Sequence, residues 1–370
     1  MNRRLLIVVC SVLACGLTQC SGKPGAQKEA KKPAPVAQAA APAQAAVKKA
    51  PSNPWAGWKP ALLGQHEQAI ADLAFSPDGR FLASAGKDKV VKLWDLASGS
   101  LARTLSGHSA GLMMADFSPD GSLLVSASAD QSVRIWDVAT GKAKRTIKDK
   151  PKKSKVKEGE PEVKIPDAIM NWAAFYPDGK KIITASDDFS LKVWDVASGK
   201  KLSEFEDPGC RQRKVLRRKD APGWIVAAGC MDDGITYLKF YDDNGTVVTS
   251  QGDENKDAHF MALDRSGKFL IAADGSVAFS VFSAQGTFLK RVMVGGYHFA
   301  LAFGPQDATL LIGTGGGEIY VYRVGTWERE GKLDVGENVA IEALAVHPTQ
   351  GSLVVGLRNG KILSFDKPVR

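Results

Sequence analysis

VKLWDLASG at residues 91–99 returns almost unchanged as VRIWDVATG at 133–141 and as LKVWDVASG at 191–199. Each copy is an alternating apolar run that ends in Trp-Asp and continues into a turn with glycine, which is typical of a half-buried β-strand and the turn after it. The first two tryptophans are 42 residues apart, and the third follows after 58 residues. The chain is therefore predicted to contain a repeat of about 42 residues, with a charged insertion at 148–164 before the third copy.

A second shared unit lies upstream of each Trp-Asp pair. It reads FSPDG at 75–79 and 117–121, and FYPDG at 175–179. Proline sets φ at the second position of a tight turn and glycine closes it, and alternating apolar strands flank the turn. Each repeat therefore predicts four antiparallel strands.

This pattern resembles the WD-repeat β-propeller family over nearly all of residues 55–370. Weaker repeats continue in phase and place an aromatic residue at the tryptophan position, namely Tyr241, Phe282, Tyr322 and Phe365. Seven such anchors predict an all-β, seven-bladed propeller of four-stranded antiparallel blades. WKPALLGQH at 58–66 matches LARTLSGH at 101–108, a fourth strand, so we expect this N-terminal strand to close the ring and remove a free sheet edge.

The resemblance implies a hydrogen-bonded network that joins a histidine, a Ser or Thr, an Asp and the tryptophan of each regular blade. In the first two blades the matching residues are His66, Ser84, Asp88, Trp94, His108, Ser126, Asp130 and Trp136. The third blade keeps Thr184, Asp188 and Trp194 but has Pro166 where the histidine belongs. We interpret these residues as structural, because each buried polar group would destabilise the fold if it were unpaired.

GHSAG at 107–111 fits the G-x-S-x-G nucleophile elbow of serine hydrolases, which needs a strand, a sharp turn and a helix around the serine. The alternating run LMMADF follows instead and predicts a strand, so Ser109 is interpreted as a loop residue and no catalytic residue is assigned. The histidines form no H-x-x-x-H pair and the cysteines no cluster, so we predict neither a metal site nor a cofactor.

Residues 1–20 resemble a lipoprotein signal segment. Two arginines precede the apolar run LLIVVCSVLA. VLAC ends at Cys15 and LTQC at Cys20, and either cysteine is a candidate for lipidation. Residues 21–54 are rich in Ala, Pro and Lys, which predicts a disordered tether. We therefore expect an exported protein of the bacterial cell envelope that is lipid-anchored and faces the periplasm, with the outer membrane favoured in a Gram-negative cell.

The formal net charge of +9 resides mainly outside the predicted propeller. The first 50 residues contain eight basic residues and one acidic residue, and 148–164 is also rich in lysine. Because the propeller itself is nearly neutral, we do not expect nucleic acid as a partner. The basic run CRQRKVLRRK at 210–219 opens the fourth blade and is expected to add positive charge to the rim of its face.

Cys210 and Cys230 are the two cysteines beyond the signal segment. Both fall in the fourth blade, near the same end of neighbouring strands. In an oxidising compartment they are therefore a candidate disulfide.

WD-repeat propellers are generally rigid, non-catalytic binding platforms, so the resemblance implies a scaffold for a protein or peptide. Together with the signal segment and the tether, we expect a membrane-tethered scaffold with a monomeric propeller. Partners usually meet the face where the blades are joined, and the corresponding positions are Gly111, Met113, Ile169, Asn171, Asp257, His259, Tyr297, Phe299 and Glu342. The alternative is that several of them belong to the core between blades. The alternative functions are a part in envelope or outer-membrane protein assembly, and an enzyme that uses the central channel.

Overall fold

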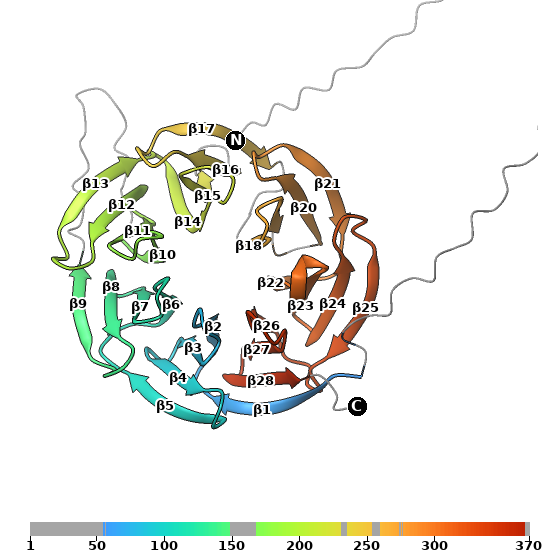
Figure 1. Ribbon diagram of the computed structural model, residues 1–370. Helices are drawn as coiled ribbons and strands as arrows, with labels where there is room; N and C mark the ends of the chain where they lie inside the picture. The colour runs from blue at the N-terminus through green and yellow to red at the C-terminus, as the bar shows by residue number, and fades with distance from the viewer. Residues whose placement is uncertain are drawn as a thin grey trace, which may run out of the picture. The chain divides into compact units, whose positions relative to one another are not determined.

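The computed structural model describes residues 55, 57–148, 168–230, 235–253, 260–273, 275 and 277–366. The chain divides into two units, Met1–Ala50 and Pro51–Arg370, and all described residues belong to the second. They form seven four-stranded antiparallel sheets, which are the blades of a β-propeller (Figure 1). The predicted fold class is therefore confirmed. Several predicted features lie outside the described residues: Cys15, Cys20, the tether 21–54, all but the first residue of 148–164, Pro166, Asp257 and His259.

Each of the first four blades consists of consecutive strands, from the innermost to the outermost. They are β2 (Ile70–Phe75), β3 (Phe81–Gly86), β4 (Val91–Asp95) and β5 (Ser100–Leu105); β6 (Leu112–Phe117), β7 (Leu123–Ser128), β8 (Ser132–Asp137) and β9 (Ala143–Lys148); β10 (Met170–Phe175), β11 (Lys181–Ser186), β12 (Ser190–Asp195) and β13 (Lys201–Glu206); and β14 (Cys210–Arg217), β15 (Trp224–Cys230), β16 (Thr236–Tyr241) and β17 (Val247–Asp253).

The fifth and sixth blades follow the same order, and the seventh combines the two ends of the propeller. Their strands are β18 (Phe260–Leu263), β19 (Phe269–Ala273), β20 (Ala278–Ser283) and β21 (Phe288–Met293); β22 (His298–Phe303), β23 (Thr309–Thr314), β24 (Glu318–Arg323) and β25 (Arg329–Asp334); and β26 (Ile341–Val346), β27 (Leu353–Leu357), β28 (Lys361–Asp366) and β1 (Lys59–Gln65). A short 3-10 turn, η1 (Pro305–Asp307), lies between β22 and β23. Among the described residues, no helix is both long and apolar enough to cross a membrane.

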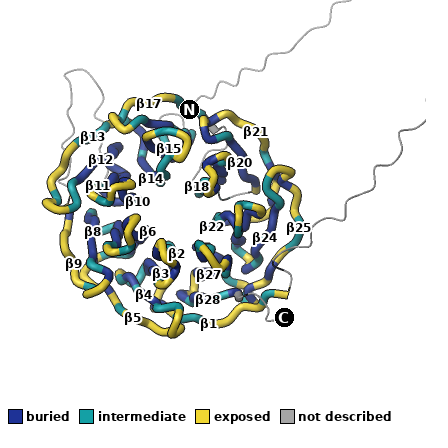
Figure 2. Tube along the Cα trace, viewed as in Figure 1, coloured by how far each residue is buried: buried dark blue, intermediate teal, exposed yellow. Residues whose placement is uncertain are grey.

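The hydrophobic core lies between neighbouring blades. Trp136 of β8 packs in a cluster with Leu93 and Leu105 of the preceding blade, and Trp194 of β12 packs with Ile147 of β9. All seven predicted aromatic anchors fall on the third strand of a blade and are buried. Among the described strand residues, the exposed ones lie on the outermost strand of each blade (Figure 2). The repeat of the sequence therefore corresponds to the repeated packing of one blade against the next.

The ring is closed by β1, which pairs with β28 from Lys59 opposite Asp366 to Gln65 opposite Lys361. Gly64 lies at a bulge in this pairing and touches the indole of Trp94 in the first blade, where a Cβ would come within 2.1 Å of a ring carbon. The absence of a side chain at Gly64 therefore lets the closing strand pass over the first anchor.

The polar network of the first blade runs from the core to the loop. Trp94 Nε1 donates a hydrogen bond to Ser84 Oγ at 2.9 Å, Ser84 Oγ lies 2.7 Å from His66 Nε2, and His66 Nδ1 lies 2.9 Å from Asp88 Oδ1. The second blade repeats these contacts at 2.9, 2.8 and 2.9 Å through Trp136, Ser126, His108 and Asp130. Because one Ser hydroxyl accepts from the indole and donates to the imidazole, every member is satisfied without solvent.

The third blade replaces the histidine with a lysine from its own third strand. Trp194 Nε1 still donates to Thr184 Oγ1 at 2.9 Å. The carboxylate of Asp188 accepts instead from Nζ of Lys192 and from the hydroxyl of Ser190. Lys192 and Asp188 have side chains that are each 1% exposed. A buried ion pair therefore anchors the loop that His66 and His108 anchor elsewhere.

Ser109 of the GHSAG stretch is exposed in the loop between β5 and β6. Its backbone N–H donates to Asp130 Oδ2 at 2.9 Å, and a strand follows it. The loop thus lacks the helix that follows the serine in a nucleophile elbow.

Candidate functional site

The innermost strands of six blades carry a β-bulge near their N-terminal end. In β2 the register passes from Ile70 to Asp72 and leaves Ala71 opposite no residue of β3. The same shift occurs at the equivalent point of β6, β10, β14, β22 and β26, and the extra residues are Met113, Asn171, Arg213, Phe299 and Glu342. A bulge bends the strand and redirects the side chain of its extra residue. All six of these residues line one cavity.

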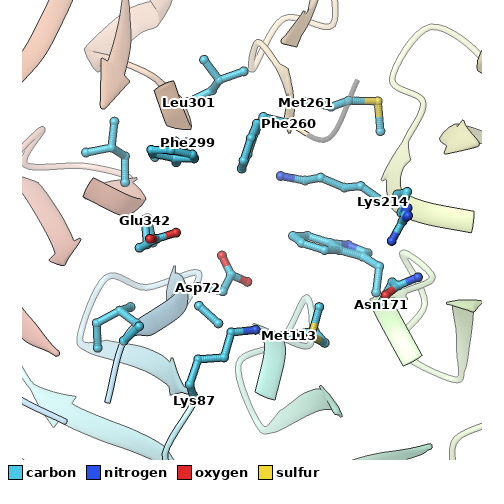
Figure 3. Close-up of a pocket in the computed structure, with 18 residues that line it drawn as sticks. Asp72, Lys87, Met113, Asn171, Lys214, Phe260, Met261, Phe299, Leu301 and Glu342 are labelled. Atoms are coloured by element: carbon cyan, nitrogen blue, oxygen red, sulfur yellow. Dashed lines mark hydrogen bonds between the residues drawn. The ribbon is translucent and has the colours of Figure 1, made fainter. Parts of the chain in front are cut away.

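This channel-mouth cavity has a volume of about 350 Å³ and lies at the end of the central channel where the innermost strands begin (Figure 3). Every innermost strand contributes to its lining, and Lys87 enters from the turn after β3. Ligand sites are typically concave and combine apolar walls with a few convergent polar groups. The cavity is therefore the candidate functional site.

One part of the wall is aromatic. Trp172, Phe260 and Phe299 line the cavity, and the rings of Phe260 and Phe299 meet edge to face with centroids 6.4 Å apart. The Nζ atom of Lys214 lies 4.4 Å from the centroid of Trp172, and the guanidinium of Arg358 lies 5.1 Å from that of Phe299. These rings offer broad apolar contact area, and two of them already hold a cation of the same chain.

Asp72 and Lys214 place opposite charges in the cavity, and Figure 3 shows both side chains directed toward its centre. Asp72 Oδ2 accepts a hydrogen bond from the backbone N–H of Ala115 at 3.3 Å. Burial raises the pKa of Asp72 to about 7, since the attraction of Lys214 offsets only part of that effect. Burial also raises the pKa of Asp116 to about 6 and lowers the pKa of Lys214. Part of the negative charge here is therefore neutralised by protons at neutral pH.

The other charged groups at the mouth are paired unequally. Glu342 accepts from the guanidinium of Arg358. Nζ of Lys87 has the Sδ atom of Met113, at 3.4 Å, as its hydrogen-bond acceptor. Burial lowers the pKa of Lys87, with the charge of Glu342 acting in the opposite direction. The carboxylate of Glu342 is therefore engaged, whereas the ammonium of Lys87 lacks a carboxylate within ion-pair distance in the described part of the chain.

Asn171 fastens the innermost strands of the third and fourth blades together. Its Nδ2 atom donates to Asp187 Oδ1 at 2.7 Å and to the backbone oxygen of Gln212 at 2.8 Å. Asp187 also faces Nη1 of Arg213 at 3.5 Å. Asn171 thus lines the cavity and belongs to the packed contact between blades at the same time.

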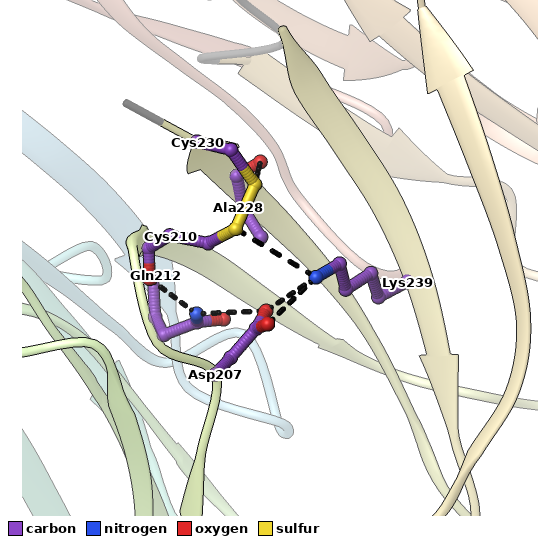
Figure 4. The surroundings of a disulfide bond; sticks show 6 residues. All are labelled: Asp207, Cys210, Gln212, Ala228, Cys230 and Lys239. Atoms are coloured by element: carbon purple, nitrogen blue, oxygen red, sulfur yellow. Dashed lines mark hydrogen bonds and ion pairs between the residues drawn. A yellow bond between two sulfur atoms is a disulfide. The ribbon is translucent and has the colours of Figure 1, made fainter. Parts of the chain in front are cut away.

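The start of β14 is held by a disulfide between Cys210 and Cys230 (Figure 4). The two cysteines are directly opposite each other on β14 and β15. Nζ of Lys239 forms an ion pair with Asp207 at 2.6 Å, and Nε2 of Gln212 donates to the backbone oxygen of Cys210 at 2.6 Å. This cross-link lies three residues before Arg213, so it restrains the strand that brings positive charge to the cavity.

The residues predicted for the partner-binding face do not all meet. Met113, Asn171, Phe299 and Glu342 line the cavity. Tyr297 lies just before β22, outside the lining, and is 71% exposed. Gly111 and Ile169 lie just before β6 and β10, and their backbone oxygens accept from the loops that follow β7 and β11.

Sequence analysis missed Asp72, Lys87, Trp172 and Phe260 as lining residues, and it placed Lys214 only within a basic rim. Asp72 was visible as the charged residue in the apolar strand IADLAF. Within the described ranges, no group of three or more His, Cys, Asp or Glu side chains is arranged to hold a metal ion.

The profile of the WD40 family (WD domain, G-beta repeat) matches residues 59–95, 99–137 and 166–195. These ranges end with the third strands β4, β8 and β12. Three of the repeats are therefore similar to WD40 repeats. WD40 propellers are typically non-catalytic scaffolds that bind protein partners. The sequence repeat and the structural blade differ by one strand. The first two matches begin in the outermost strand of one blade, or just before it, and end in the third strand of the next blade.

Relatives differ in how much of the chain they match. Eukaryotic translation initiation factor 3 subunit I of Aspergillus oryzae is 25% identical over 349 residues, which are 84% of this chain and 95% of that protein. Nuclear distribution protein PAC1 of Scheffersomyces stipitis is 45% identical over 58 residues, and probable serine/threonine-protein kinase PkwA of Thermomonospora curvata is 43% identical over 51 residues. Each of these two matches spans 14% of this chain, but only 11% of PAC1 and 7% of PkwA.

Proposed function

We propose that the protein is a non-catalytic scaffold that binds a protein or peptide at the channel-mouth cavity. The observation that carries this proposal is the convergence on one cavity of six bulge residues, Phe299 among them, and the aromatic side chains of Trp172 and Phe260. Aromatic and arginine side chains in a desolvated pocket are the usual anchors of protein interfaces. A rigid propeller also presents them with little loss of conformational entropy on binding.

The serine, histidine and aspartate of the second blade do not argue for hydrolysis. Ser126 is fully buried, and its hydroxyl oxygen already accepts the indole N–H of Trp136. A catalytic serine must reach its substrate. The network of Ser126, His108 and Asp130 is therefore assigned to stability.

We further propose that the scaffold is a monomeric, lipid-anchored protein of the bacterial cell envelope, facing the periplasm. The support is the N-terminal sequence, in which a short apolar run leads to Cys15 and Cys20 and then to the Ala, Pro and Lys-rich stretch. Metabolic labelling with palmitate tests the anchor. Label is expected in the wild type, and one of the two single variants, Cys15→Ser or Cys20→Ser, should lose it. Label retained in the double variant would exclude both sites.

Affinity purification from detergent-solubilised envelopes tests partner binding. The test variant is Phe299→Asp in the cavity, and the matched control is Val248→Asp on the outer strand β17, where the side chain is 60% exposed. Partner recovery is expected with the wild type and the control, and not with Phe299→Asp. If a folded Phe299→Asp variant recovered the same partner equally well, the site would lie elsewhere.

A further inference from the structure

The charges of the channel-mouth cavity do not balance. Lys87, Arg213 and Lys214 line it as cations, and Asp72 and Glu342 as carboxylates. Glu342 is engaged by Arg358, and Arg213 faces Asp187 at 3.5 Å. The carboxylate of Asp72 is therefore left opposite two ammonium groups, those of Lys87 and Lys214. A buried charge without a partner is costly, so a ligand that supplies the missing charge gains from relieving that cost.

The lysines are the least satisfied of these groups. Nζ of Lys214 lies on the face of Trp172, and Nζ of Lys87 has a thioether sulfur as its hydrogen-bond acceptor. Neither ammonium forms an ion pair with a described residue. An ammonium can donate three hydrogen bonds, so both side chains have donors left for an incoming acceptor.

We propose that the cavity binds an acidic peptide segment, whose carboxylates pair with Lys214 and Lys87 while neighbouring apolar side chains pack on Phe260 and Phe299. This inference rests on the proposed partner-binding function and names the chemistry of the partner. A basic segment is disfavoured because it would meet the two lysines against Asp72, the one lining carboxylate that has no ion pair with a described residue.

Asp72 makes the proposal specific in its pH dependence. The groups that face it are Lys214 from β14 and Asp116 from β6, with Lys87 and Glu342 further around the lining. An acidic ligand adds negative charge beside Asp72 and favours its protonated form. Binding is therefore coupled to proton uptake, and it tightens as the pH falls from 8 to 6, around the Asp72 pKa of about 7.

The experiment is selection of a random nonapeptide phage library on the full-length protein in detergent, followed by affinity measurement on the enriched peptides. Enrichment of Asp or Glu next to aromatic or aliphatic residues is expected. Lys214→Gln and Lys87→Gln should each weaken the best peptide by about tenfold or more, because each removes a hydrogen bond between charged groups. The control Lys332→Gln, on the exposed strand β25, should leave the affinity unchanged.

The Asp72→Asn variant separates charge recognition from simple apolar binding. It should bind the peptide more tightly than the wild type at pH 8 and show a smaller change in affinity between pH 8 and pH 6, with the remainder due to Asp116. Enrichment of basic or uncharged peptides, no enrichment, or full affinity in folded Lys214→Gln and Lys87→Gln variants would overturn the inference. A cellular partner lost with Phe299→Asp but retained with both lysine variants would keep the proposed function and reject only the acidic ligand.

Discussion

Ring closure can be tested at a single residue, Gly64. A Cβ at this position would lie 2.1, 2.3 and 2.8 Å from three carbons of the Trp94 ring. The ring cannot easily yield, because it is 5% exposed and its Nε1 atom is held by Ser84 at 2.9 Å. The closing strand β1 must therefore shift away from Trp94 in a Gly64→Ala variant, which strains its pairing with β28.

The magnitude follows from the cost of adding a methyl group to a packed site, about 1–3 kcal/mol. For a propeller of this size that corresponds to a decrease in Tm of roughly 2–5 °C. Thermal melts followed by tryptophan fluorescence provide the measurement. The matched control is Ala61→Val on the same strand, where the side chain is exposed opposite Ser364, and it should melt like the wild type.

A larger perturbation extends the same reasoning. Deletion of residues 58–64 removes most of the pairing with β28 and exposes a sheet edge, so we expect it to abolish folding. If the Gly64→Ala variant melted like wild type, the contact with Trp94 would not restrain the strand. A deletion variant that melted like the intact protein would refute ring closure by β1.

Three further predictions concern the polar networks. Ser126→Ala leaves Trp136 Nε1 and His108 Nε2 without the hydroxyl that joins them and should lower the free energy of unfolding by about 2 kcal/mol or more. The control Ser109→Ala, at an exposed position, should leave stability unchanged. Equal urea-denaturation midpoints for the two variants would contradict this prediction. Lys192→Met leaves the buried carboxylate of Asp188 without its cationic partner and should lower the free energy of unfolding by about 3–5 kcal/mol in the same denaturation assay. A decrease smaller than that of Ser126→Ala would show that the ion pair contributes little. Burial lowers the pKa of His108 below its ordinary 6.5 despite hydrogen bonding to a carboxylate, so the unfolded chain takes up the proton first and this contribution to stability should fall as the pH drops through 6.5 toward the folded-state value. Asp72 and Asp116 titrate in the same range with the opposite sign, so the measurement compares the change in Tm between pH 7.5 and pH 5.5 in the wild type and in a His108→Asn variant; the same change in both proteins would argue against the prediction.

Much of the fold could be predicted because the repeat is written into local sequence. The Trp-Asp strands and the Pro-Asp-Gly turns each have a signature of a few residues, and seven aromatic anchors in phase set the number of blades. The network of the third blade was harder to predict. Lys192 occupies the same repeat position as Lys92 and Arg134, yet Lys92 donates to the backbone oxygen of Gln65 and Arg134 to that of Gly107. Only packing determines that Lys192 turns to Asp188 instead.

The architecture could be predicted from the repeat, since core positions recur at a fixed spacing and every blade buries the same face against its neighbour. The repeat also located the residues at which the innermost strands begin, and four of those predicted for the binding face line the cavity: Met113, Asn171, Phe299 and Glu342. Which side chains meet there depends on the closed ring. Six bulges, each a local departure from the strand register, redirect residues from distant strands into one cavity, and the unbalanced charges of Asp72, Lys87 and Lys214 exist only once the ring brings them together.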